Sequence, residues 1–274
     1  MSRLLAKVFG LLGLLVLVAA SCAPAGAPPK QSAIQITDQL GRVVKLDKVP
    51  QRIVSLAPSN TEILFALGLS DKVVGVTTYC DYPLEAKEKP KIGGFSTPDI
   101  EKIVVAAPDL VVAASIHAKT VIPQLESRGL KVLVLAPKTV DDVVQAIDLA
   151  GDATGTQASA DKLVANMQSR IKLVAGLVAA LPSDARPRVF YVVWQDPLMT
   201  VGADTLQGQL IEMAGGKNIF GELSGYPTVD LEVVLQRQPQ IIIAGVGHGS
   251  GQDAPLQWAR SEPRLKDTEA RQQG

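Results

Sequence analysis

Two segments in different halves of the chain, residues 99–113 and residues 230–244, repeat one pattern. Each begins with Asp, has Glu at its third position, continues as an apolar helical stretch, and passes a proline before a short apolar run that ends in Ala. A helix followed by a strand, present twice, predicts two similar lobes, each with a carboxylate at the same place, Glu101 and Glu232. That layout suits a two-lobed binding protein that docks symmetrically on a partner.

Short apolar runs alternate with amphipathic stretches on both sides of one long helical segment. Such alternation is typical of βαβ units, so we assign residues 33–155 to an N-terminal and residues 183–274 to a C-terminal Rossmann-like α/β lobe. Apolar residues recur every three or four positions from Leu163 to Leu181, which predicts a single linking helix over residues 156–182. About 25 helical residues rise roughly 37 Å, enough to bridge two lobes.

The end of the chain differs from the rest. From Lys266 to Gly274 it contains no apolar segment. We therefore expect the C-terminal lobe to be incomplete, as in a truncated chain or a fragment.

The first residues have the composition of a lipoprotein signal peptide. Residues 1–21 contain an early Arg and Lys, then an apolar run, then small residues before Cys22. Cys22 is the predicted lipidation site, and residues 22–32, rich in Pro, Gly and Ala, form a predicted flexible tether. An uncleaved membrane anchor is the alternative. Both place the body in the cell envelope, in the periplasm or at the outer face of the cytoplasmic membrane.

The overall composition excludes several classes of protein. Hydrophobic residues make up 47% of the 274-residue chain, which indicates a folded core rather than disorder. Lys and Arg together number 27, as do Asp and Glu, so charge gives no reason to expect nucleic-acid binding. With Cys22 lipidated, Cys80 has no partner for a disulfide. We expect a monomer.

Aromatic residues make up only 4% of the chain, so those in turns are candidates for ligand contacts. Tyr79, Asp81 and Tyr82 follow an apolar strand, and ligands in α/β sheets bind at the carboxyl ends of strands. A tyrosine offers a flat apolar face and a hydroxyl, which suits a large ring. A turn with purely structural tyrosines is the alternative.

The repeat also places an aromatic residue six positions before each Glu, Phe95 in the first copy and Tyr226 in the second. Thr97 and Pro98 are expected to open the helix that carries Glu101. One interpretation is that the rings of Phe95 and Tyr226 face the same ligand. The other is that each ring packs independently in its own lobe. Trp194, in a polar turn after a strand, is a further ligand-binding candidate, with a buried core position as the alternative.

Neither a metal site nor a catalytic site is indicated. His117 could contact a ligand or its metal and His248 lies far away in the sequence, but the two form no cluster with zinc-ligand spacing. After the glycine-rich residues 245–251, the helix that a phosphate-binding loop requires does not start cleanly, because residues 252–255 interrupt it, and a mobile loop at the edge of the cleft is the alternative. The chain also carries no GxSxG, HExxH or local Cys/His signature, so we do not expect an enzyme.

Several of these segments together resemble a known family. The run Arg52–Glu62, the turn Tyr79–Pro83, the doubled Glu helix and residues 214–220 are similar to periplasmic binding proteins of ABC importers for vitamin B12, haem and ferric siderophores. The resemblance extends from about Asp38 to Gln257 and is closest to the vitamin B12 binders.

The resemblance implies two α/β lobes with a ligand cleft between them, and no cofactor other than the transported ligand. It implies a corrinoid such as cobalamin as ligand, with Tyr79, Phe95, Trp194 and Tyr226 at aromatic cleft positions. It also implies that Glu101 and Glu232 meet arginines of the membrane permease. A haem or ferric siderophore ligand remains an alternative within the family, and an envelope hydrolase or sensor domain remains one outside it.

Overall fold

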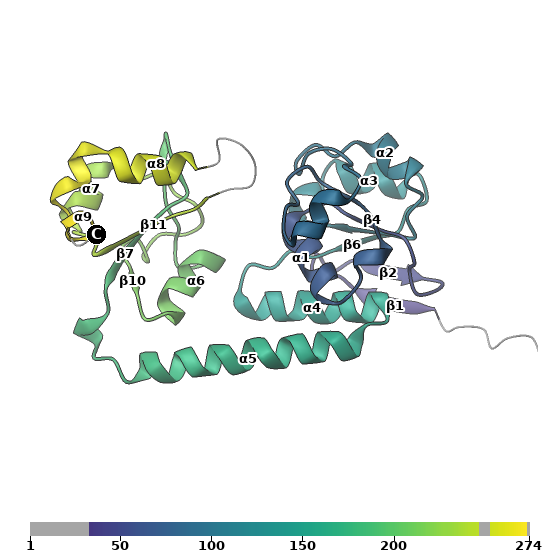
Figure 1. The fold of residues 1–274 in the computed structure, drawn as a ribbon, viewed down its shortest axis with the longest axis horizontal. Coiled ribbons are helices and arrows are strands. Elements are labelled where there is room, and N and C mark those ends of the chain that lie inside the picture. The colour runs from purple at the N-terminus through teal and green to yellow at the C-terminus, as the bar shows by residue number, and fades with distance from the viewer. Residues whose placement is uncertain (1–32, 247–252, 273–274) are drawn as a thin grey trace, which may run out of the picture. The chain divides into compact units, whose positions relative to one another are not determined.

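The computed structural model describes residues 33–246 and 253–272. The predicted signal peptide and tether, with Cys22, lie outside the described residues, and so does His248. Two α/β lobes are joined by α5 (Gln157–Ala179), a single helix of 23 residues (Figure 1). Both the two-lobed α/β fold and the linking helix were predicted from the sequence, and the structure confirms them.

The first lobe contains a four-stranded parallel sheet. Its strands, in the order in which they pair, are β4 (Val73–Val76), β3 (Ile53–Ser55), β5 (Leu110–Ala113) and β6 (Val132–Val134). An antiparallel hairpin precedes the sheet and consists of β1 (Ile34–Thr37) and β2 (Val43–Leu46). The central strands β3 and β5 are buried throughout and, apart from Ser55, apolar, as expected for a parallel sheet that is covered on both faces.

Helices cover both faces of this sheet. They are α1 (Pro58–Ala66), α2 (Ile100–Val105), α3 (Val121–Glu126) and α4 (Val140–Thr154), with short 3-10 turns η1 (Ser70–Lys72), η2 (Leu84–Glu88) and η3 (Ser115–His117). Alternate strand residues belong to different core clusters: Val112 packs with residues of α1 and α4, and Val111 with residues of α2 and α3. The sheet is therefore doubly wound.

The second lobe repeats this plan with a smaller described sheet. Its parallel strands pair in the order β10 (Lys217–Asn218), β7 (Arg188–Val192), β11 (Ile241–Ala244). A short hairpin follows β7 and consists of β8 (Trp194–Gln195) and β9 (Leu198–Met199). The helices are α6 (Leu206–Met213), α7 (Leu231–Gln236), α8 (Ala254–Ser261) and α9 (Glu269–Gln272), with the turns η4 (Ser183–Ala185) and η5 (Pro263–Asp267).

The repeated pattern in the sequence corresponds to α2 with β5 and to α7 with β11. In each lobe an arginine at the start of the first sheet strand, Arg52 or Arg188, binds the end of the Glu-bearing helix. Arg52 Nε donates to the carbonyl oxygen of Ala107 at 3.2 Å, and Arg188 Nε donates to that of Gln238 at 2.7 Å. These bonds join the residue after each helix cap to the start of a sheet strand, so the two lobes position their glutamate helices in the same way.

One helix boundary differs from the prediction. Helix α2 begins at Ile100 rather than at Pro98, and the side chain of Asp99 caps it by accepting a hydrogen bond of 3.1 Å from the Lys102 amide. Pro98 instead pairs with Gly93 across a tight turn that displays Phe95. The cap therefore lies closer to Glu101, which occupies the first turn of the helix.

Candidate functional site

Tyr79 and Tyr82 lie on a loop that leaves the carboxyl end of β4, and a buried side chain between them anchors the loop. Cys80 is almost fully buried, and its Sγ lies 3.1 Å from the hydroxyl oxygens of both Thr61 and Thr77. Because Cys80 points into the lobe, its neighbours can project outward, and Tyr79 is 40% and Tyr82 65% exposed. Cys80 therefore occupies a buried, structural position in the lobe.

A lysine closes the same loop from its other end. Lys91 Nζ donates hydrogen bonds to the carbonyl oxygens of Cys80, at 3.2 Å, and Ala86, at 2.9 Å. Asp81 lies half-buried on this loop. The tyrosines are therefore displayed on a segment whose backbone is bound to the lobe on both sides.

Phe95 lies at the tip of a tight turn that packs against Tyr79. Gly93 has φ of +101°, and a Cβ added there would lie 2.6 Å from the Asp99 amide nitrogen, so this turn requires glycine. A Cβ added at Gly94 would lie 3.8 Å from Cε2 of Tyr79, which places the turn beside the tyrosine ring. The structure thus brings two predicted ligand-binding aromatics together in the first lobe.

His117 does not have the position that the sequence suggested. Its side chain is fully buried, and both ring nitrogens already bind backbone groups: Nδ1 accepts from the Ala114 amide at 3.0 Å, and Nε2 lies 2.7 Å from the Phe95 carbonyl oxygen. Burial lowers the pKa of His117, and the hydrogen bond to the Phe95 carbonyl opposes that shift only in part. A ligand or a metal ion could not reach this ring unless the Phe95 turn moved away.

In the second lobe, Trp194 lies on the β8–β9 hairpin directly after β7. Its Nε1 donates a hydrogen bond of 2.9 Å to the carbonyl oxygen of Asp196, within the hairpin turn, and the side chain is 39% exposed. The indole ring is therefore held by its polar edge while part of its apolar surface faces solvent. This geometry agrees with the predicted display at a strand end and not with the alternative of a buried core tryptophan.

Tyr226 lies on a segment that is hydrogen-bonded to the Trp194 hairpin. The Thr200 amide donates to the Pro227 carbonyl at 3.0 Å, and Met199 of β9 forms a β-bridge with Thr228. The Tyr226 hydroxyl donates to Oε1 of Gln207 at 3.2 Å, and the residue is 51% exposed. The second lobe therefore also carries a pair of partly exposed aromatic residues on adjoining segments.

Tyr191 is a further aromatic residue near Tyr226, and it was not predicted as a ligand contact. It lies in β7 and is half-buried, and a Cβ added at Gly245 would lie 3.6 Å from its hydroxyl oxygen. Burial raises the pKa of Tyr191, and the nearby Tyr226 hydroxyl adds to the rise. Strand alternation was the available signal, because Phe190 and Val192 face the core cluster while Tyr191 faces the opposite side.

Glu101 and Glu232 occupy matching positions on α2 and α7 and are among the more exposed acidic side chains, at 78% and 71%. Each lies in the first turn of its helix, where the helix dipole favours a negative charge. Each also pairs with an arginine of its own lobe: Arg128 Nη2 lies 3.2 Å from Glu101 Oε1, and Arg264 Nη1 lies 3.6 Å from Glu232 Oε1. The two carboxylates are thus presented alike.

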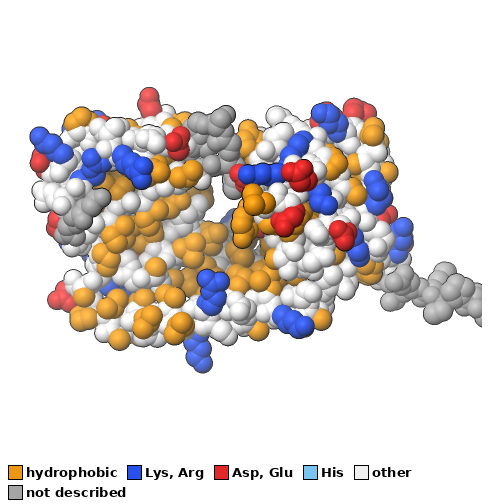
Figure 2. Space-filling model, viewed as in Figure 1, with side chains coloured by type: hydrophobic (Ala, Val, Ile, Leu, Met, Phe, Trp, Pro, Cys, Tyr) orange, Lys and Arg blue, Asp and Glu red, His pale blue; other side chains and the backbone are white. Residues whose placement is uncertain are grey.

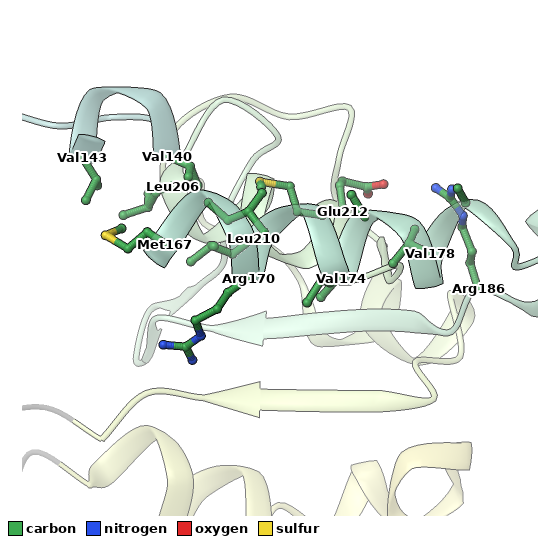
Figure 3. A pocket seen from close by; sticks show the side chains of 15 residues that line it. Val140, Val143, Met167, Arg170, Val174, Val178, Arg186, Leu206, Leu210 and Glu212 are labelled. Carbon is green, nitrogen blue, oxygen red and sulfur yellow. The ribbon is translucent and has the colours of Figure 1, made fainter. Parts of the chain in front are cut away.

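A pocket of about 780 Å³ lies elsewhere, along α5. Figure 3 shows the side chains that line it, mostly aliphatic and from α4, α5 and α6, with Arg170, Glu212 and, after the turn η4, Arg186 as the charged members. Hydrophobic side chains also lie exposed along α5 (Figure 2), where Leu173 and Leu177 are 67% and 65% exposed. Because its described lining includes no aromatic ring, we do not assign the ligand to this pocket.

The described part of the chain contains neither a metal-ligand cluster nor a helix that could span a membrane. Over residues 33–246 and 253–272 there is no group of three or more His, Cys, Asp or Glu side chains placed to hold a metal ion. None of the described helices is both long enough and apolar enough to cross a membrane.

Comparison with known proteins shows the family of this chain. A family model described as periplasmic binding protein matches residues 53–274. The chain is a member of the periplasmic binding protein family. An ABC transporter substrate-binding lipoprotein of Bacillus subtilis is 34% identical over 257 residues, an alignment that covers 88% of this chain and 82% of the relative.

Two further relatives differ in what their names say they bind. A cobalamin-binding protein of Halobacterium salinarum is 33% identical, with 87% of this chain and 69% of the relative covered. The structure of a periplasmic haem-binding protein from Roseiflexus sp. RS-1 superposes with a TM-score of 0.72 at 26% identity, covering 81% of this chain and 86% of that one.

As a periplasmic binding protein, the chain is a transport component and not an enzyme, which confirms that prediction. It is a substrate-binding protein of ABC importers, a class that delivers ligands to a permease from outside the cytoplasm. Its relatives include both cobalamin and haem binders, so membership of the family leaves the ligand open.

Proposed function

We propose that this periplasmic binding protein captures a corrinoid and delivers it to the permease of an ABC importer. The observation that carries the proposal is a pair of partly exposed aromatic residues on backbone-anchored segments in each lobe. Tyr79 and Phe95 form the pair in the first lobe, and Trp194 and Tyr226 form it in the second. The similarity to the cobalamin-binding protein of Halobacterium salinarum supports the corrinoid as ligand.

A corrinoid suits such rings because it is a large ring with apolar faces and a polar rim. Aromatic contacts contribute ~0.5–1.5 kcal/mol each beyond the burial of their area. Four such contacts, together with hydroxyl groups at the rim, are enough to hold the ligand without covalent chemistry. Tyr82 and Asp81, on the same loop as Tyr79, are assigned to the polar rim.

Glu101 and Glu232 are proposed to dock on arginines of the permease. Exposed ion pairs are worth only ~0–1 kcal/mol each, so two of them determine the register of docking more than its strength. The internal partners, Arg128 and Arg264, hold each carboxylate at the surface before docking. On docking, each glutamate would then exchange its internal arginine for a permease arginine, or pair with both. No unpaired carboxylate would have to enter the interface.

Attachment to the membrane is proposed to occur through a lipid on Cys22. The similar protein of Bacillus subtilis is named a lipoprotein, and the signal-like residues before Cys22 agree with that name. A Cys22→Ser chain should be released from the membrane fraction into the soluble fraction, whereas Cys80→Ser should stay with the membranes.

Haem is the second candidate ligand, and one observation favours it specifically. Tyr82 is 65% exposed, and a tyrosine hydroxyl is an established axial ligand of haem iron. The structural similarity to a haem-binding protein at 26% identity supports the same alternative.

The absorbance spectrum of the protein purified with its natural ligand separates the two. The full chain should be isolated from cells supplied with both cobalamin and haem, in mild detergent and without a denaturing step. Corrinoid bands that co-elute with the protein and disappear in a Tyr79→Ala, Trp194→Ala variant would support the proposal. A Soret band in place of the corrinoid bands would overturn it in favour of haem.

A further inference from the structure

The His117 ring has one protonation state that satisfies both of its nitrogens. Its Nδ1 lies 3.0 Å from the Ala114 amide nitrogen, which can only donate, so Nδ1 must be the acceptor and carry no proton. The proton of the neutral ring is therefore on Nε2, which donates to the carbonyl oxygen of Phe95 at 2.7 Å. A second proton on Nδ1 would break the bond to Ala114.

The sheet determines where this histidine lies. His117 ends η3, the short turn that directly follows β5, and its own amide donates to the Ala114 carbonyl at 3.1 Å. Backbone and side chain of His117 thus both bind Ala114, which fixes the ring relative to the end of β5. A ring held in this way can act as a rigid anchor for a second segment.

That second segment is the Phe95 turn, and His117 contacts it twice. Besides the hydrogen bond to the Phe95 carbonyl, the two rings meet edge to face, with centroids 5.5 Å apart and an interplanar angle of 77°. The base of the turn is held independently by the bridge between Gly93 and Pro98. His117 contacts the tip of the turn, where Phe95 lies.

We propose that His117 is a positioning residue for Phe95, which orders the ring for ligand binding before any ligand arrives. The inference rests on the proposed function, because it takes Phe95 as a ligand contact. A segment already held in its bound conformation loses less conformational freedom on binding, so such a contact raises affinity without touching the ligand. A purely structural histidine would affect stability and leave the turn and the affinity unchanged.

Two conservative substitutions separate the two bonds of the ring. In His117→Gln the side-chain amide can reach the position of Nε2 and donate to Phe95, but it loses the acceptor for Ala114. In His117→Asn the shorter side chain keeps an acceptor near the position of Nδ1 and loses the donor to Phe95. Each variant breaks one of the two hydrogen bonds of the ring and keeps the other, in the same buried site. Each is therefore the matched control for the other.

The first measurement uses the full chain without ligand. Amide hydrogen exchange at Gly94, whose amide donates to the Thr97 carbonyl at 3.3 Å within the turn, should be about tenfold faster in His117→Asn than in wild type, as expected for the loss of one hydrogen bond. In His117→Gln it should stay within about threefold of wild type. Equal exchange in wild type, Gln and Asn proteins would overturn the proposal.

The second measurement is affinity for cyanocobalamin. The dissociation constant should rise about tenfold in His117→Asn and return close to the wild-type value in His117→Gln. An unchanged constant in folded His117→Asn would overturn the proposal. If wild type itself does not bind cyanocobalamin, the proposed ligand is wrong, and the positioning role is then judged by the exchange measurement alone.

A measurement on wild type covers the case in which neither variant folds. Nitrogen-15 labelling of histidine should show a ring protonated at Nε2 whose proton exchanges slowly with solvent. A ring protonated at Nδ1, or a rapidly exchanging Nε2 proton, would overturn the proposal.

Discussion

Ala107 and Gln238 share an uncommon backbone conformation, with φ of +45° at both. Each is the residue between a glutamate-bearing helix and the proline before the next strand, and each carbonyl accepts a hydrogen bond from an arginine. A left-handed conformation costs a residue with a Cβ ~1–2 kcal/mol, so both lobes tolerate the same strain at the same turn. The repeat therefore extends from the sequence pattern to the details of the backbone.

Relief of this strain should stabilise the first lobe. Ala107→Gly removes the clash of Cβ but adds freedom to the unfolded chain, so we expect a net gain of ~0.5 kcal/mol in the free energy of unfolding. Ala106→Gly, one residue earlier in a right-handed conformation, is the control and should lose ~0.5–1 kcal/mol. Urea denaturation measures both. Destabilisation of equal size in the two variants would show that Ala107 is not strained.

Reversal of both docking charges should stop transport and spare ligand binding. We expect Glu101→Arg with Glu232→Arg to lower uptake of labelled cyanocobalamin at least about tenfold in cells that carry the cognate importer. The substitutions remove two proposed ion pairs with the permease, worth up to ~1 kcal/mol each, and place arginine opposite arginine, so that like charges repel. Asp152→Arg, at an exposed position of α4, is the control and should transport normally. Normal uptake by the double variant would rule out the docking role.

Removal of the displayed indole should weaken ligand binding. Trp194→Ala should raise the dissociation constant for cyanocobalamin about tenfold, since it removes one aromatic contact and its buried area. Trp258→Phe is the control, because Trp258 packs against the core of the second lobe. Isothermal titration calorimetry of the two variants checks this, and an equal effect of both would remove Trp194 from the site.

Stability should depend on pH through His117. Burial lowers the pKa of its ring in the folded protein, whereas the unfolded ring keeps a value of about 6.5. Below that pH the unfolded state binds a proton that the folded state resists, so stability is complete above about pH 6.5 and falls as the pH falls further. The loss is at most about 1.4 kcal/mol per pH unit.

The comparison is with His117→Gln, which cannot titrate at this position. Urea denaturation at several pH values between about 7.5 and 5 should show a steeper decline for wild type than for the variant. The carboxylates and His248 are present in both proteins, so their contributions to the pH dependence cancel when the two declines in stability are subtracted. Parallel declines would show that His117 does not lose a proton on folding.

Local patterns in the sequence were enough to predict the two lobes, α5 and the paired glutamates. The helix start at Ile100 was predicted two residues too early, because Pro98 takes part in the Phe95 turn instead of opening the helix. The burial of His117 was not predictable, since its bond to Phe95 joins segments 22 residues apart on neighbouring loops. Periodicity describes elements one at a time and carries no information on which loops meet at a sheet edge.

The most direct test of the central claim is isothermal titration of the full chain in detergent with cyanocobalamin and, separately, with haemin. The corrinoid proposal predicts saturable binding of one cyanocobalamin per chain, with a dissociation constant of about 1 µM or less and weaker binding of haemin. Saturable binding of haemin, with no saturable binding of cyanocobalamin, would contradict it.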